Sequence, residues 1–149
     1  MILYLDASAL VKQYVAEVGS RETARLIKGG DVVGTAAISR AEVSAALAKA
    51  KRVGVLAAGA AAVALHAFRA EWKDLARLQV TETLIARADA LAWDHGLRGY
   101  DAVHLAGAVF WQETLGEPVT VATFDRELWQ VARRVGMMVW PADLARFAT

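Results

Sequence analysis

Short apolar runs alternate with longer segments of helical periodicity along the whole chain. The runs fall at residues 2–5, 31–38, 78–80, 119–123 and 137–140, and each has the length of a strand. Apolar residues recur at helical spacing over residues 7–17, 20–30, 39–54, 81–95, 101–115 and 126–135, and an alanine-rich helix ends near residue 72. The pattern therefore predicts five strands connected by helices.

Continuous apolar strands that alternate with helices are typical of an α/β fold. Strands of this kind are buried on both faces, which requires a parallel sheet between two layers of helices, with right-handed crossover connections. The 149 residues are enough for one ordinary core, and the chain contains no repeat, low-complexity segment or internal boundary. We therefore expect a single domain over residues 1–149.

Composition and charge exclude several classes of protein. A hydrophobic content of 56% with only 2 prolines indicates a globular chain rather than a disordered one. Lys and Arg number 17 against 16 for Asp and Glu, so a nucleic acid would have to be bound by a local patch. There is no cysteine, which removes disulfides, thiolate zinc sites and thiol nucleophiles and fits a reducing compartment.

Neither a signal peptide nor a membrane span is expected. The first residues have no basic region, and their apolar run stops at Asp6. The longest uncharged stretch, residues 53–68, is rich in alanine and glycine and is shorter than the ~20 apolar residues of a span. We therefore expect a cytoplasmic protein that does not contact membranes.

Four carboxylates take equivalent places in this pattern. Asp6 directly follows the first strand and Asp125 the fourth, while Glu42 and Asp101 lie at the starts of helices. In an open α/β sheet these places gather at the carboxyl edge of the strands, where ligands bind. The four side chains are therefore expected to converge.

Each carboxylate also has a purely structural explanation. Asp and Glu are favoured at helix caps and in first turns, and Ser39 with Glu42 matches a capping box. Taken together, however, four converging negative charges repel each other unless a cation lies between them. A hard divalent ion such as Mg²⁺ or Mn²⁺ suits carboxylate oxygens and activates water for phosphodiester hydrolysis. The three histidines, His66, His95 and His104, are too far apart in sequence to form a closely spaced zinc set.

Four segments carry a resemblance to a known family. YLDASALVKQYVAEVGS, ISRAEVSAAL, RGYDAVHLAGA and TFDREL resemble segments of PIN-domain ribonucleases, in particular the VapC toxins of toxin–antitoxin pairs. The match keeps order and spacing from residue 2 to residue 140. It implies a five-stranded parallel sheet of order 3-2-1-4-5 between helices, in a homodimer.

The resemblance also implies an activity and its residues. Asp6, Glu42, Asp101 and Asp125 match an acidic quartet that holds one or two Mg²⁺ or Mn²⁺ ions and the water that attacks RNA. Ser8 and Thr123 match hydroxyl residues that orient the carboxylates. The implied activity is a metal-dependent endoribonuclease, the toxin of a type II toxin–antitoxin system. Its implied partner is a VapB antitoxin, a small DNA-binding protein whose C-terminal segment wraps the toxin groove and can send a basic side chain into the acidic site.

Other candidates have a structural interpretation that is stronger than the functional one. His104 lies one helical turn after Asp101, but a histidine on an apolar helix is more often hydrogen-bonded inside the core. Three tryptophans at apolar positions favour the core or a dimer interface over base stacking: Trp93, Trp111 and Trp129. Six basic residues form either an RNA phosphate track or solvated helix faces: Arg21, Arg25, Arg40, Lys49, Lys51 and Arg52.

Two other classes of protein, one of phosphatases and one of signalling receivers, are excluded because each requires a residue that this chain lacks. A haloacid-dehalogenase-type phosphatase needs a second Asp two residues after the first, and Ser8 stands there. A response-regulator receiver needs a late lysine, and none follows Lys73. The serious rival is a catalytically inactive PIN-like module that binds RNA or a protein without cleavage. Metal-dependent RNA cleavage, with EDTA as the control, distinguishes the two.

Overall fold

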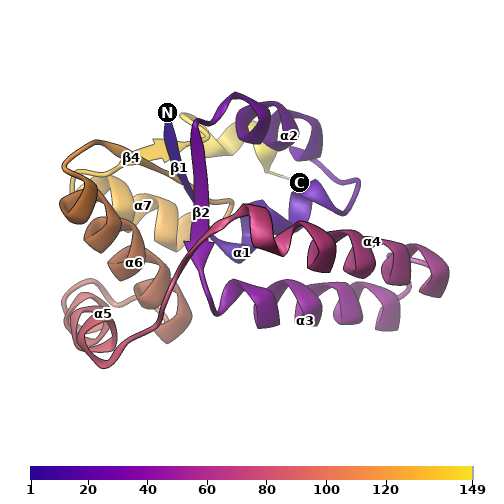
Figure 1. Cartoon of the computed structure of the whole chain (residues 1–149), viewed down its shortest axis with the longest axis horizontal. Coiled ribbons are helices and arrows are strands. Elements are labelled where there is room, and N and C mark those ends of the chain that lie inside the picture. Colours follow the sequence, from indigo (N-terminus) through magenta and orange to yellow (C-terminus); the bar gives the residue numbers. More distant parts are fainter. Residues whose placement is uncertain (149) are drawn as a thin grey trace.

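A five-stranded parallel sheet of order β3-β2-β1-β4-β5 forms the centre of the computed structural model, which describes residues 1–148 (Figure 1). The strands are β1 (Ile2–Leu5), β2 (Val32–Ala36), β3 (Ala76–Leu78), β4 (Val119–Ala122) and β5 (Met138–Trp140). Each neighbouring pair is parallel, so the predicted sheet and its order are confirmed. The order changes direction at β1, which makes the carboxyl ends of β1 and β4 a topological switch point.

Helices cover both faces of the sheet, as predicted. They are α1 (Ala7–Leu10), α2 (Ser20–Gly29), α3 (Ser39–Arg52), α4 (Ala58–Glu71), α5 (Glu82–His95), α6 (Gly99–Leu115) and α7 (Arg126–Arg134), with short 3₁₀ turns η1 (Val11–Gln13), η2 (Trp72–Asp74) and η3 (Leu144–Phe147). In Figure 1, α5, α6 and α7 lie on one side of the sheet and α1 to α4 on the other. No helix within residues 1–148 is both long enough and apolar enough to cross a bilayer.

The core consists of two hydrophobic clusters, one on each face of the sheet. Successive side chains of a strand point to opposite faces, so Tyr4 joins the cluster with Leu105 of α6, whereas Leu5 joins the cluster with Phe68 of α4. Tyr4 and Leu5 are both completely buried. The central strand β1 therefore fixes where the residue that follows it, Asp6, emerges.

Long-range contacts shift two of the predicted elements. The expected helix over residues 7–17 is too long: α1 ends at Leu10, and after η1 the Tyr14 hydroxyl donates a hydrogen bond to Glu71 of α4 (2.7 Å), while Lys12 Nζ donates to Glu17 Oε1 (3.0 Å) and the Val18 carbonyl (2.7 Å). The third strand covers residues 76–78 rather than 78–80, because Ala76 pairs with Gly34 of β2.

Of the two positions expected for the tryptophans, the core or a dimer interface, the core is wrong for one of them. Trp93 is 88% exposed on α5. Trp111 and Trp129 are half-buried, and Trp111 packs against the first hydrophobic cluster. Trp93 thus contributes surface rather than core.

Candidate active site

Asp6 is held at the carboxyl edge of β1 by three hydrogen-bond donors. Its Oδ1 accepts the Ala9 amide at the start of α1 (3.0 Å), and Ser8 Oγ lies 2.7 and 2.9 Å from the two carboxylate oxygens. Thr123 Oγ1, from the end of β4, donates to Asp6 Oδ2 at 2.6 Å. The two hydroxyl residues singled out in the sequence therefore both contact Asp6.

This carboxylate is buried, and burial has an electrostatic consequence. Loss of solvent raises the pKa of Asp6, while the nearby His104 ring and the hydrogen bonds from Thr123, Ser8 and Ala9 oppose that rise. The net direction is upward. An ionised Asp6 is thus costly in the isolated chain and would be stabilised by a cation.

Asp101 and Asp125 share one arginine. Arg98 donates from Nε to Asp101 Oδ2 (2.9 Å) and from Nη2 to Asp125 Oδ2 (2.6 Å). The other oxygen of Asp125 caps α7 by accepting the Leu128 amide (2.9 Å). A single guanidinium therefore joins the first turn of α6 to the start of α7.

The three aspartates lie in one electrostatic neighbourhood. Burial raises the pKa of Asp101, and the negative charge of Asp125 adds to that rise, with a smaller contribution from Asp6. Arg98 acts in the opposite direction and does not cancel the effect. The sheet edge thus gathers Asp6, Asp101 and Asp125, as the sequence pattern predicted.

Glu42 faces the same edge but is bound to a histidine. His104 Nε2 lies 2.6 Å from Glu42 Oε1, and His104 Nδ1 lies 2.8 Å from the Tyr4 hydroxyl. An ionised Glu42 only accepts hydrogen bonds, so His104 donates from Nε2 in either protonation state. His104 is buried and hydrogen-bonded as expected, and it also fixes the direction of a candidate metal ligand.

The capping box expected for Glu42 is wrong. Ile38, not Ser39, is the N-cap of α3, and no side chain caps that helix. Ser39 is buried and lies 2.6 Å from the Thr35 hydroxyl, which bonds to the Leu5 carbonyl at the end of β1. Glu42 is therefore not held by its own helix terminus.

Arg98 is the site residue that sequence reasoning missed. Its signal is present, because it lies three residues before Asp101, a spacing at which side chains meet on a helix. The six basic residues named instead lie on α2 and α3 and are exposed: Arg21, Arg25, Arg40, Lys49, Lys51 and Arg52. Their contact with RNA stays a prediction.

The donor set fits a hard divalent cation. Carboxylate oxygens converge at one edge, burial and mutual repulsion disfavour their charge, and a guanidinium already lies between two of them. Within residues 1–148, no three Asp, Glu or His side chains already form a group that could enclose an ion. Binding would therefore require some of these side chains to move from their present positions.

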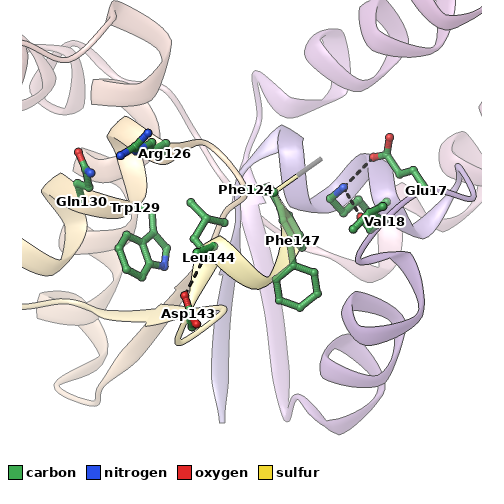
Figure 2. A pocket seen from close by; sticks show the side chains of 12 residues that line it. Glu17, Val18, Phe124, Arg126, Trp129, Gln130, Asp143, Leu144 and Phe147 are labelled. Carbon is green, nitrogen blue, oxygen red and sulfur yellow. Dashed lines mark hydrogen bonds and ion pairs between the residues drawn. The ribbon is translucent and has the colours of Figure 1, made fainter.

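An aromatic pocket adjoins the acidic edge. Phe124 and Arg126, on either side of Asp125 in the chain, line it together with Trp129 of α7 and Phe147 of η3 (Figure 2). Phe124 and Phe147 meet edge to face with ring centroids 5.5 Å apart. The pocket is thus lined by the aromatic and the basic residue that flank Asp125 in the chain.

Comparison with known proteins gives one consistent result. Residues 3–134 match the PIN domain family. Ribonuclease VapC49 from Mycobacterium tuberculosis (strain H37Rv) is 38% identical over 144 residues, which cover 96% of this chain and 97% of the relative.

Two solved structures show the same fold. PAE2754 from Pyrobaculum aerophilum has a TM-score of 0.64 at 23% identity, covering 99% of this chain and 89% of that one. VapBC2 from Rickettsia felis, solved bound to a DNA fragment from its promoter, has a TM-score of 0.62 at 14% identity, covering 93% of this chain and 97% of that one. The fold of the chain is thus a recurrent one.

Proposed function

Because the chain belongs to the PIN domain family, with VapC-type ribonucleases among its relatives, we propose that it is a metal-dependent endoribonuclease, the toxin of a toxin–antitoxin pair. The proposal is carried by one observation. Asp6, Asp101 and Asp125 meet at the carboxyl edge of β1 and β4, where buried hydroxyls and a guanidinium compensate their charge. Such an arrangement is suited to binding cations and the phosphate of a nucleic acid.

Each polar residue at the edge has a distinct part in this proposal. Asp6, Asp101, Asp125 and Glu42 would hold Mg²⁺ or Mn²⁺, and Ser8 and Thr123 position Asp6 through their hydroxyl groups. When bound, such an ion makes a water molecule a nucleophile at neutral pH and neutralises charge on the phosphate that is attacked. His104 keeps Glu42 directed to the edge through a 2.6 Å contact.

The aromatic pocket supports RNA as the substrate. Bases stack on aromatic side chains, and phosphates pair with arginine. Phe124, Phe147 and Arg126 provide both kinds of group in one pocket, and Phe124 and Arg126 flank Asp125 in the chain. A single-stranded RNA could therefore place a base in the pocket while its backbone passes the carboxylates.

Cleavage of a labelled RNA by the purified chain tests the proposal. Product is expected with Mg²⁺ or Mn²⁺ and not with EDTA. Asp6→Asn and Asp101→Asn should lower the rate by about 100-fold or more, because even indirect partners of metal ligands cost about 10- to 100-fold. Glu42→Gln and Asp125→Asn should cost less where a water replaces the lost oxygen. Asp94→Asn, an exposed change on α5, is the charge-matched control. Cleavage that survives EDTA or Asp6→Asn would refute the proposal.

One observation favours a second function, a PIN-like module that binds RNA or a protein without cleavage. The carboxylates already have partners within the chain, so the fold does not depend on a cation. The same assay distinguishes the two functions. RNA that is retained by the protein in Mn²⁺ but stays intact would favour the binding module.

The proposed partner is a VapB-type antitoxin. One structural neighbour is a toxin–antitoxin complex from Klebsiella pneumoniae, and the acidic edge suits a basic side chain from a partner. Expression of this chain alone should arrest bacterial growth. Co-expression with a small neighbouring reading frame should restore growth and yield a complex that copurifies.

A homodimer is also proposed, on the face formed by α5 and α6. Ile85 and Tyr100 line one shallow groove between these helices, and Trp93 is exposed nearby on α5. Exposed large apolar side chains of this kind are typical of interfaces. Sedimentation equilibrium should give twice the chain mass, and Trp93→Glu should weaken the association. A monomeric wild type would refute the dimer.

A further inference from the structure

Arg98 is an exposed cation that lies over less exposed acids. Its side chain is 68% exposed, whereas those of Asp101 and Asp125 are 12% and 22% exposed. The residue is the N-cap of α6 and its side chain makes no capping hydrogen bond, so its two ion pairs are the contacts that hold it. The guanidinium is therefore more exposed to solvent than the two carboxylates that it joins.

The oxygens that Arg98 engages are those a cation would need. Asp125 Oδ1 accepts the Leu128 amide of the α7 cap, which leaves Oδ2 as the oxygen directed to the site, and Arg98 Nη2 lies 2.6 Å from it. Arg98 Nε lies 2.9 Å from Asp101 Oδ2. A divalent ion at the same two oxygens would face the guanidinium at close range, and two cations repel.

We propose that Arg98 is a displaceable internal counterion. It neutralises Asp101 and Asp125 in the metal-free chain, and a divalent cation binds these carboxylates only after the guanidinium has left them. Arg98 thus sets the concentration of metal at which the site fills. The inference rests on the proposed function, because it assumes that the site takes a divalent cation.

The size of the effect follows from the exposure of the pairs. A ligand that binds only one of two states loses apparent affinity in proportion to the population of that state. Because exposed ion pairs are individually weak, Arg98 should lower metal affinity modestly. Removing it should tighten binding by about 3- to 10-fold.

Calorimetric titration of Mn²⁺ into EDTA-treated, dialysed protein tests this. Arg98→Gln should bind Mn²⁺ about 3- to 10-fold more tightly than wild type. Arg87→Gln is the matched control, since it removes the same charge and a bidentate ion pair. That pair joins Arg87 to Glu113 (both contacts 2.6 Å) near the C-terminal end of α6. Arg87→Gln should bind like wild type, and an Arg98→Gln affinity equal to wild type would overturn the proposal.

A second variant separates contact from charge. Arg98→Lys keeps the positive charge but loses the planar fork that engages two carboxylates at once. It should bind Mn²⁺ about 2-fold or more tightly than wild type if the contact matters. Wild-type affinity in Arg98→Lys, with tighter binding in Arg98→Gln, would mean that only long-range charge acts, and this would also overturn the proposal.

The guanidinium itself can be followed by NMR. The Arg98 Nε–Hε signal, assigned by its loss in Arg98→Lys, should shift and exchange faster with solvent as Mg²⁺ saturates the protein, while the Arg87 signal stays in place. A signal that does not move although Mg²⁺ binds would overturn the inference.

Binding of equal strength in wild type and Arg98→Gln, with RNA cleavage intact, would overturn the Arg98 inference alone. Absence of metal binding in both proteins would instead contradict the metal requirement of the proposed function.

Discussion

Thr123→Val removes one buried hydroxyl and keeps the shape of the side chain. That hydroxyl donates to Asp6 Oδ2 at 2.6 Å and accepts the Asp125 amide at 3.0 Å. It therefore connects the ends of β1 and β4 with the start of α7. The substitution tests whether the hydroxyl positions the acidic edge or merely fills space.

The expected loss can be worked from these two contacts. A hydrogen bond to a charged group contributes about 1.5–3 kcal/mol, and a bond between neutral groups contributes about 0.5–1.5 kcal/mol. Thr123→Val should therefore lower the free energy of unfolding by about 2–4 kcal/mol. The control Thr123→Ser keeps the hydroxyl and loses one methyl group, which costs about 1 kcal/mol.

The loss should depend on pH, with a sign fixed by Asp6. Burial raises the pKa of Asp6 in the folded chain and the Thr123 hydrogen bond opposes the rise, so removing that bond raises the pKa further. A raised folded-state pKa makes the ionised form costly above it, and the cost disappears as pH falls through that pKa toward the unfolded value. The deficit of Thr123→Val should thus be largest near neutral pH and shrink in acid.

Urea unfolding in EDTA measures both quantities. Wild type, Thr123→Val and Thr123→Ser would be compared at about pH 7 and about pH 5. A deficit of Thr123→Val no larger than that of Thr123→Ser would refute the assigned contacts. A deficit that stays constant with pH would refute the link to Asp6.

Three further substitutions give sharp outcomes. Asp101→Asn should raise the unfolding free energy of the metal-free chain at neutral pH, because burial and Asp125 raise the pKa of Asp101 and make its ionised form costly. Mn²⁺ should raise the melting temperature of this variant less than that of wild type. Equal increases in the two proteins would exclude Asp101 from a metal site. His104→Leu should cost about 2–4 kcal/mol in urea unfolding, and His104→Gln should cost less in both stability and cleavage rate, because its amide can still donate to Glu42. Gly34→Ala should lose about 1–3 kcal/mol, since its Cβ would lie 2.7 Å from the Trp111 ring and 2.9 Å from the Ala76 carbonyl, while Gly59→Ala, with no atom within 4 Å, should melt at or above the wild-type temperature.

The strands were predictable where burial alone decides them. β1 and β4 are continuous apolar runs because both of their faces are covered, so the pattern located them closely. The predicted position of β3 was two residues too late in the chain. β3 begins where Ala76 pairs with Gly34, a distant residue whose missing side chain leaves room for the Ala76 carbonyl. The helix after Asp6 was overextended for a similar reason: Tyr14 donates a hydrogen bond to Glu71 of α4 at 2.7 Å, and local periodicity carries no trace of that contact.

The site was predictable from sequence where an acidic residue follows a strand and also begins a helix. Asp6 and Asp125 cap α1 and α7 and also lie at the acidic edge, so the capping interpretation is confirmed for both and does not conflict with their place at the candidate site. Glu42 is different, because its partner His104 lies 62 residues away and no local rule links the two. Arg98 was missed because a search for converging acids gives no place to a residue of opposite charge.

The partners of the acids explain how the chain folds around converging negative charge. Asp6 has two hydroxyls and an amide, Glu42 has His104, and Asp101 and Asp125 have Arg98. Within residues 1–148 every buried side-chain polar atom has a hydrogen-bond partner, which is the condition for burying such groups without a large penalty.

The partners of the acids differ in how easily a bound cation could displace them. The hydroxyls that contact Asp6 belong to Ser8 of α1 and to Thr123 directly after β4, and they can stay while a cation binds, because each carboxylate oxygen accepts more than one partner. The guanidinium of Arg98 carries a positive charge and is exposed, so it is the partner that a cation must replace. In the proposed exchange, therefore, a cation would displace Arg98, because Arg98 is the charged and exposed partner, while Ser8, Thr123 and His104 would keep the acids in place.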